Sequence, residues 1–195
     1  MTATTVICTN AVEIDTPHIY ITPTLYSVVG VNSRVGIWIN TISLPRHIKA
    51  QINRIFPNCE PSLDQFLIKD TANFHGFDIS KFKNLDCINA LSTSIKEHGK
   101  AFTLYLNSEG VEIDSLHSVD ELITNFEEHY QGCFDSIEDY VDYYYQETGL
   151  LNSIKAAGLP RYYIDWVAIA RDWECSGNYL FLKESYDQIH VFTNY

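Results

Sequence analysis

Four carboxylates stand at a spacing that could support acid–base chemistry. They recur at i, i+3, i+4 and i+7, on one stripe of a helix: Asp135, Glu138, Asp139 and Asp142. Neighbours at these spacings lie about 5–6 Å apart. General acid–base pairs need surroundings that separate their pKa values, and an exposed helix face does not supply them. We therefore interpret the four residues as a row of negative charge.

Other reactive residue types form no pattern typical of catalysis. The histidines include no H-E-x-x-H spacing, and no phosphate-binding glycine loop or G-x-S-x-G turn occurs. Glu127–His129 could bind a metal together with Asp135, but a solvated helix end explains these residues better. Cys133 has no evident partner base and is expected to be a buried thiol. Arg171 is expected to form a structural ion pair. The sequence therefore indicates no enzyme, no metal site and no cofactor.

The cysteines and the N-terminal segment indicate a cytoplasmic protein. Five scattered cysteines without a C-x-x-C pair suggest reduced thiols. Residues 1–17 lack the positive region and apolar run of a secretory signal. No stretch approaches the ~18 apolar residues that a membrane-spanning helix needs.

The net charge of −12 is concentrated in the second half of the chain. Residues 1–108 hold 8 Asp and Glu against 9 Lys and Arg, whereas residues 109–195 hold 17 against 4. From residue 109 to residue 147 there are twelve carboxylates and no Lys or Arg. Such asymmetry indicates a surface that repels nucleic acid and attracts the proteins that bind it. Solubility is the competing explanation, but a solubilising face usually mixes both signs.

A helix that ends at Glu147 must position the carboxylate row. Asp135 or Ser136 can cap its start, and Gly149 can stop it. An apolar stripe lies opposite the carboxylates and is expected to be core: Ile137, Tyr140, Val141 and Tyr144.

A shorter helix and a hairpin are expected to complete this region. Asp165 can cap a helix that ends near Gly177 and that buries Trp166 and Trp173. The pattern then predicts a β-hairpin whose strands are residues 179–182 and 189–192.

The first half of the chain predicts a small sheet with a helix. Strands are expected at 18–26 and 35–40, and a short one near 66–69. Ser43 can cap a helix that has Pro45 in its first turn.

The middle of the chain is more helical. Apolar residues at helical spacing run from Leu85 to Ile95, and Gly99 closes that helix. Residues 101–106 fit a strand or a helix equally well, and Ser118–Glu121 has the pattern of a capping box that starts another helix. The fold class is therefore α+β.

Residues in the last third resemble the signature of the ArdA-type antirestriction proteins. They keep order and spacing over roughly residues 118–195: Phe126, Tyr130, Gly132, Ser136, Asp139–Tyr140, Tyr144, Glu147–Thr148–Gly149, Tyr163–Ile164–Asp165, Ala170–Arg171–Asp172, Ser176–Gly177 and His190–Val191–Phe192. A weaker likeness covers the expected opening strands at 18–21, 36–38 and 66–70.

The resemblance implies a non-enzymatic inhibitor of type I restriction–modification enzymes, encoded on mobile elements. It implies an elongated dimer of three small domains, which would be 1–83 (with a loose extension at 1–17), 84–130 and 131–195. The first would be an α+β domain, the second helical, and the third an acidic α+β domain that ends in a hairpin. It also implies that residues 100–108 are helical.

The same resemblance implies that carboxylates imitate the phosphates of bent B-form DNA and occupy the DNA-binding cleft of the enzyme. The expected mimic surface has ten members: Glu121, Glu127, Glu128, Asp135, Glu138, Asp139, Asp142, Glu147, Asp172 and Glu174. Tyr143 and Tyr145 flank the apolar stripe and are candidates for the dimer contact.

Two other functions remain open from the sequence. The protein could be a DNA mimic directed at another nucleic-acid machine, such as a CRISPR effector or a regulator. It could also be an acidic adaptor for a basic protein unrelated to restriction. Duplex DNA must displace a DNA mimic from its target, whereas it need not displace an adaptor.

Overall fold

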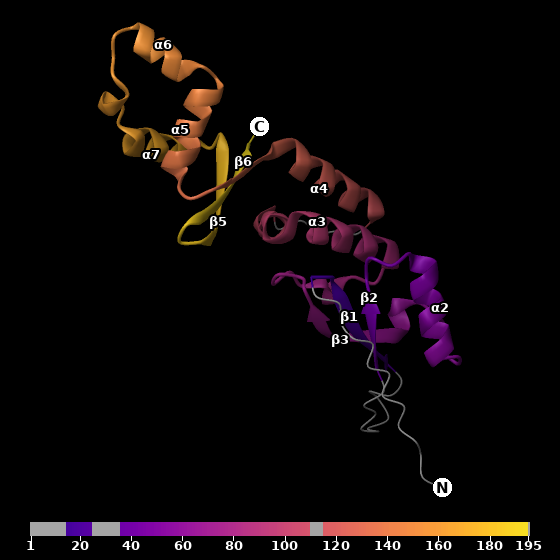
Figure 1. Ribbon diagram of the computed structural model, residues 1–195. Helices are drawn as coiled ribbons and strands as arrows, with labels where there is room; N and C mark the ends of the chain where they lie inside the picture. The colour runs from indigo at the N-terminus through magenta and orange to yellow at the C-terminus, as the bar shows by residue number, and fades with distance from the viewer. Residues whose placement is uncertain (1–14, 25–35, 110–114, 195) are drawn as a thin grey trace. The chain divides into compact units, whose positions relative to one another are not determined.

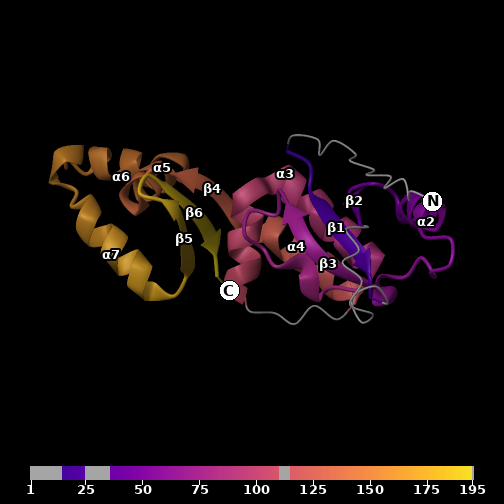
Figure 2. The ribbon, with the colours of Figure 1, turned by 90° about the horizontal axis from the view of Figure 1, so that it is seen from below.

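The computed structural model describes residues 15–24, 36–109 and 115–194 of the chain, without the side chain of residue 109. The described residues form two three-stranded antiparallel sheets and helices α2 to α7 (Figures 1 and 2), which confirms the α+β class. The chain divides into two units, Met1–Ile123 and Thr124–Tyr195, and each is described by itself. The three-domain division stays a prediction. No helix in the described ranges is long and apolar enough to cross a membrane.

The N-terminal sheet has the order β2-β1-β3, and its central strand β1 (His18–Pro23) pairs antiparallel with both neighbours. β2 spans Ile37–Asn40 and β3 spans Phe66–Ala72. Two cross-strand pairs of β-branched residues, Ile19 with Ile39 and Ile21 with Ile37, are almost fully buried. All three expected strands are therefore present, although Tyr26 and Val35 lie outside the described residues.

The segment before β1 is partly packed. Thr16 and Pro17 are buried, and the Pro17 carbonyl accepts hydrogen bonds from the backbone and the hydroxyl of Thr41. The part of the expected loose extension that is described therefore belongs to the folded unit, and residues 1–14 lie outside the described ranges.

Helix α2 (Pro45–Ile55) begins one residue later than a Ser43 cap requires. Leu44 is the N-cap residue, no side chain caps the helix, and Pro45 is its first residue. The expectation for Ser43 was wrong, because its hydroxyl is one position too early to reach the free N–H groups of the first turn. Ile48 and Ile52 bury the apolar stripe.

Helix α3 (Leu85–Glu109) is interrupted where the sequence predicts a stop. Gly99 has a φ of 59° and a ψ of −133°, so two helical stretches meet at a kink. Residues 100–108 are helical, which settles the ambiguity at 101–106 and confirms the expectation from the family. Helix α4 (Leu116–His129) starts before Ser118, and the Ser115 hydroxyl accepts the hydrogen bond of the Ser118 N–H, so the capping box at Ser118 was also wrong.

The C-terminal sheet has the order β4-β6-β5. β5 (Tyr179–Ser185) and β6 (Gln188–Thr193) form the predicted hairpin. The sequence analysis missed β4 (Tyr130–Phe134), which pairs with the other edge of β6.

Three helices accompany this sheet: α5 (Ile137–Glu147), α6 (Leu150–Ala156) and α7 (Trp166–Ser176), with a short 3-10 turn, η3 (Arg161–Tyr163), between the last two. The core joins Ile137 and Val141 of α5 to Ala170 of α7 and Ile189 of β6. Ser136 caps α5 and Asp165 caps α7, as predicted, and Gly177 ends α7 in the left-handed conformation.

Replacing Tyr140 by Ala is expected to destabilise the C-terminal unit by about 3–5 kcal/mol, because a fully buried aromatic ring leaves a cavity that its neighbours cannot fill. Urea unfolding followed by tryptophan fluorescence would measure this in a Trp38→Phe background, where only Trp166 and Trp173 report. The matched control is Tyr186→Ala, because Tyr186 is fully exposed and its loss should change stability by less than about 0.5 kcal/mol. Equal stabilities of the two variants would contradict this packing.

Candidate acidic interaction surface

The C-terminal unit carries most of the net negative charge. Residues 124–195 contain twelve Asp and Glu against four Lys and Arg, a formal net of −8. Nine of the ten predicted surface carboxylates belong to this unit, and Glu121 lies on α4 in the other. Seven of the nine are exposed, and Glu138 and Asp142 are half-buried. The predicted charge therefore lies at the surface.

Ser136 fixes the start of α5 and one of its carboxylates. The Ser136 hydroxyl accepts a hydrogen bond from the Asp139 N–H at 3.1 Å and donates to Asp139 Oδ2 at 2.7 Å. Glu138 and Asp139 occupy the first turn, where the positive end of the helix dipole favours negative charge. Asp139 is thus held in place, and the position of both carboxylates in the first turn favours the helix.

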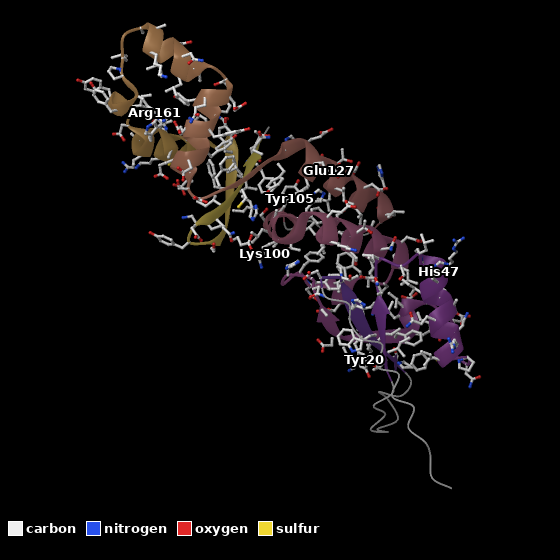
Figure 3. The ribbon with its side chains drawn as sticks, viewed as in Figure 1. Tyr20, His47, Lys100, Tyr105, Glu127 and Arg161 are labelled. Carbon is white, nitrogen blue, oxygen red and sulfur yellow. The ribbon has the colours of Figure 1, made fainter. Side chains whose placement is uncertain are left out.

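Asp142 differs from the other members of the row. Its Oδ2 accepts hydrogen bonds from the Arg161 guanidinium and from Gln146 Nε2, and its side chain is only 21% exposed. Figure 3 shows Arg161 on the part of the chain that follows α6. Residues 109–147 contain no Lys or Arg, but Asp142 is paired with a cation that lies nineteen positions along the chain. The other carboxylates nearby, Asp135, Glu138, Asp139 and Glu147, form no ion pair with any residue in the described ranges.

Helix α7 adds Asp172 and Glu174, which are both exposed. Arg171 is exposed as well, and it forms no ion pair with any described residue, so the expected structural ion pair is not found there.

The two tyrosines proposed for a dimer contact have different surroundings. Tyr143 is 48% exposed and packs beside Phe134. The ring of Tyr145 stands edge-on to Trp166 at 5.5 Å and packs on the core cluster of its own unit. Tyr143 is therefore the more accessible candidate.

A polar network that the sequence analysis missed joins the three strands of the C-terminal sheet. His190 is buried in the central strand; its Nδ1 lies 2.9 Å from the Tyr130 hydroxyl, and its Nε2 lies 2.9 Å from Glu184 Oε2. Cys133 stands opposite His190 on β4. Because both ring nitrogens are engaged, His190 is not available as a base for the Cys133 thiol.

The environment of Cys133 opposes nucleophilic chemistry. The thiol is exposed, which corrects the expectation that it is buried. Partial desolvation raises its pKa above the ordinary value, and the negative charges of Glu184 and Asp135 add to that rise. In the described ranges no three His, Cys, Asp or Glu side chains come close enough to hold a metal.

A cavity of about 490 Å³ opens on the N-terminal unit. Its wall mixes Lys49 and Lys83 with Glu60 and Asp86 and includes none of the predicted site residues. The predicted charge is thus spread over a surface and does not line this cavity.

Alkylation of Cys133 by iodoacetamide is expected to be slower at pH 7 than alkylation of free glutathione, because the raised pKa leaves less thiolate. Mass spectrometry would follow the reaction in a variant with the other four cysteines replaced by serine. The rate should rise through a pH above the ordinary thiol range. A rate above that of glutathione at pH 7 would show that the Cys133 thiol is activated, and it would support a catalytic role for this cysteine.

Comparison with known proteins agrees with the resemblance seen in the sequence. No curated protein and no solved structure shows a significant match to the chain. The family model described as antirestriction protein (ArdA) matches residues 31–188, which is most of the chain and includes α5, α7 and most of the C-terminal sheet. The chain therefore belongs to the ArdA family of antirestriction proteins, which act against restriction–modification enzymes.

Proposed function

We propose that the protein inhibits type I restriction–modification enzymes by presenting carboxylates in place of DNA phosphates. The observation that carries the proposal is the exposure of Asp135, just before α5, and of Asp139 and Glu147 on the helix; none of the three forms an ion pair with a residue that the structure describes. The cytoplasm, where such enzymes act, would be its place of action.

The charge row fits the electrostatics of DNA-binding proteins. Such proteins gain much of their affinity from Lys and Arg side chains that neutralise phosphates. On each strand of the duplex the phosphates are spaced at about 3.4 Å along the helix axis. Glu138 and Asp139 lie in the first turn of α5, and Asp135 lies two residues before the helix, so negative charge gathers there in a way that Lys and Arg side chains could bind. A mimic of this kind offers no base edges, so it would inhibit enzymes of differing sequence specificity.

The way α5 is held supports a preformed surface. Ser136 closes the first turn, and buried Tyr140 fixes the opposite side of the helix. Carboxylates on a fixed helix lose little conformational freedom on binding, so more of the electrostatic attraction contributes to affinity.

A homodimer is part of the proposal, as the resemblance implies. Tyr143 is an exposed aromatic residue on the same helix, and aromatic residues are enriched at protein interfaces. Its contact would place a second copy of α5 beside the first.

Neutralising four carboxylates tests the proposed surface. The variant Asp135→Asn, Glu138→Gln, Asp139→Asn, Glu147→Gln keeps side-chain shape, and Asn at 139 can still accept the Ser136 hydrogen bond. We expect inhibition of a type I enzyme to weaken about thirtyfold, or about 0.5 kcal/mol per carboxylate. Added salt should also weaken the variant less than the wild type.

The matched control removes the same charge from the N-terminal unit: Asp64→Asn, Asp70→Asn, Asp86→Asn and Glu97→Gln, all exposed positions. It should inhibit nearly as well as the wild type. Equal losses in the two variants would mean that only net charge matters, and full inhibition by the α5 variant would exclude this helix as the mimic surface.

A further inference from the structure

One cation of the C-terminal unit is placed on the acidic helix, and the other three are not. Residues 124–195 hold four Lys and Arg side chains, and within the described ranges Arg161 alone of the four forms an ion pair, with Asp142. The other three are exposed: Lys155, Arg171 and Lys183. The pairing is therefore a feature of this position and does not follow from a general neutralisation of the unit.

Both carboxylate oxygens of Asp142 are closed to a cation from outside. Oδ2 accepts hydrogen bonds from the Arg161 guanidinium and, at 2.8 Å, from Gln146 Nε2. Oδ1 is buried and has no hydrogen-bond partner in the part of the chain that the structure describes. A Lys or Arg of another protein can therefore bind Asp142 only if Arg161 leaves it.

Arg161 is held by more than this carboxylate. Its guanidinium carbon stands 5.9 Å from the centroid of the Trp166 ring, which attracts the cation through the electron density on its face. Its carbonyl accepts the hydrogen bond of the Ile164 N–H at 3.0 Å and so closes the turn of η3. The side chain and the backbone are both fixed, which favours an ion pair that persists in solution.

The pair changes the charge that α5 offers. Asp139 and Glu147 are exposed on this helix and form no ion pair with a described residue, whereas Asp142 and Arg161 together carry no net charge. Coulomb attraction weakens with distance and with screening, so a cation beside these carboxylates reduces their attraction more than a distant one does. The attraction of α5 for a cationic cleft is thus smaller than its sequence alone implies.

We propose that Arg161 limits the affinity of the acidic surface for its target by holding Asp142 in an intramolecular ion pair. The inference rests on the proposed function and makes Arg161 an affinity-determining residue that acts through Asp142. Specificity is a difference of affinities, and an acidic surface attracts every protein with a cationic cleft. A built-in cation lowers this general attraction and leaves a larger share of the affinity to the fit between the surfaces.

The test compares full-length Arg161→Gln with the wild type in an inhibition assay against a type I restriction–modification enzyme at several salt concentrations. We expect inhibition to strengthen by about twofold to fivefold at low salt, as for the loss of an exposed ion pair that opposes binding. The gain should shrink as salt is added. Arg161→Met keeps an aliphatic stem for Trp166 and should show the same gain, so the test does not depend on the folding of one variant. Circular dichroism would verify the fold of each.

Three control variants separate this effect from a structural role and from net charge. Arg161→Lys keeps the cation and should inhibit like the wild type. The double variant Asp142→Asn, Arg161→Gln removes the pair at constant net charge and should also match it. Arg54→Gln makes the same change of charge at an exposed position on α2, in the other unit, and should have little effect.

Inhibition by folded Arg161→Gln and Arg161→Met that is no stronger than that of the wild type would overturn the inference. A loss of inhibition shared by Arg161→Lys would assign the pair to holding η3 against α5 instead. An equal gain in Arg54→Gln would mean that only net charge matters. Failure of the proposed function is distinguishable, because the four-carboxylate variant would then inhibit fully.

Discussion

Tyr140 occupies the centre of the C-terminal unit, and the geometry of the acidic surface depends on its burial. Its ring contacts Phe134 of β4, Trp173 of α7, and Tyr179 and Phe181 of β5. Burial raises the pKa of its hydroxyl, with smaller contributions from the neighbouring tyrosines, so this side chain stays neutral. Because the Tyr140 ring packs against four aromatic side chains of other elements, it fixes the rotation of α5 about its own axis. That rotation decides which carboxylates reach solvent.

The charges of α5 follow from this constraint. With Ile137, Tyr140 and Val141 buried, Asp139 and Asp142 lie on the opposite face of α5, and Glu138 lies at its side. Arg161 forms an ion pair with Asp142, whereas Glu138 and Asp139 form no ion pair with any described residue. The same ion pair joins α5 to η3, the turn that exposes Tyr162 and Tyr163.

The sequence predicted those features that depend on neighbours a few residues apart. The apolar stripe of α5 and the caps at Ser136 and Asp165 are local and are confirmed, and the helix that was expected to end at Gly99 is interrupted there. The cap at Ser43 was wrong by one residue, because Pro45 as the first helical residue makes Leu44 the cap.

Features that depend on contacts between residues far apart in the sequence were not predicted. Strand β4 is five residues long with Gly132 in its middle, and only pairing with β6 makes it a strand. The Asp142–Arg161 pair and the network around His190 join residues from separate elements, so no spacing of residues in the sequence predicts them. The exposure of Cys133 likewise follows from its place on an edge strand.

The central claim is that the protein and DNA occupy the same site on the target enzyme. Measuring the apparent affinity of the wild-type protein for a type I restriction–modification enzyme at increasing concentrations of duplex DNA tests it most directly. If the protein mimics DNA, the apparent dissociation constant rises in proportion to the DNA concentration, as for mutually exclusive ligands. A dissociation constant that does not change with DNA, together with a ternary complex of enzyme, DNA and inhibitor, would contradict mimicry.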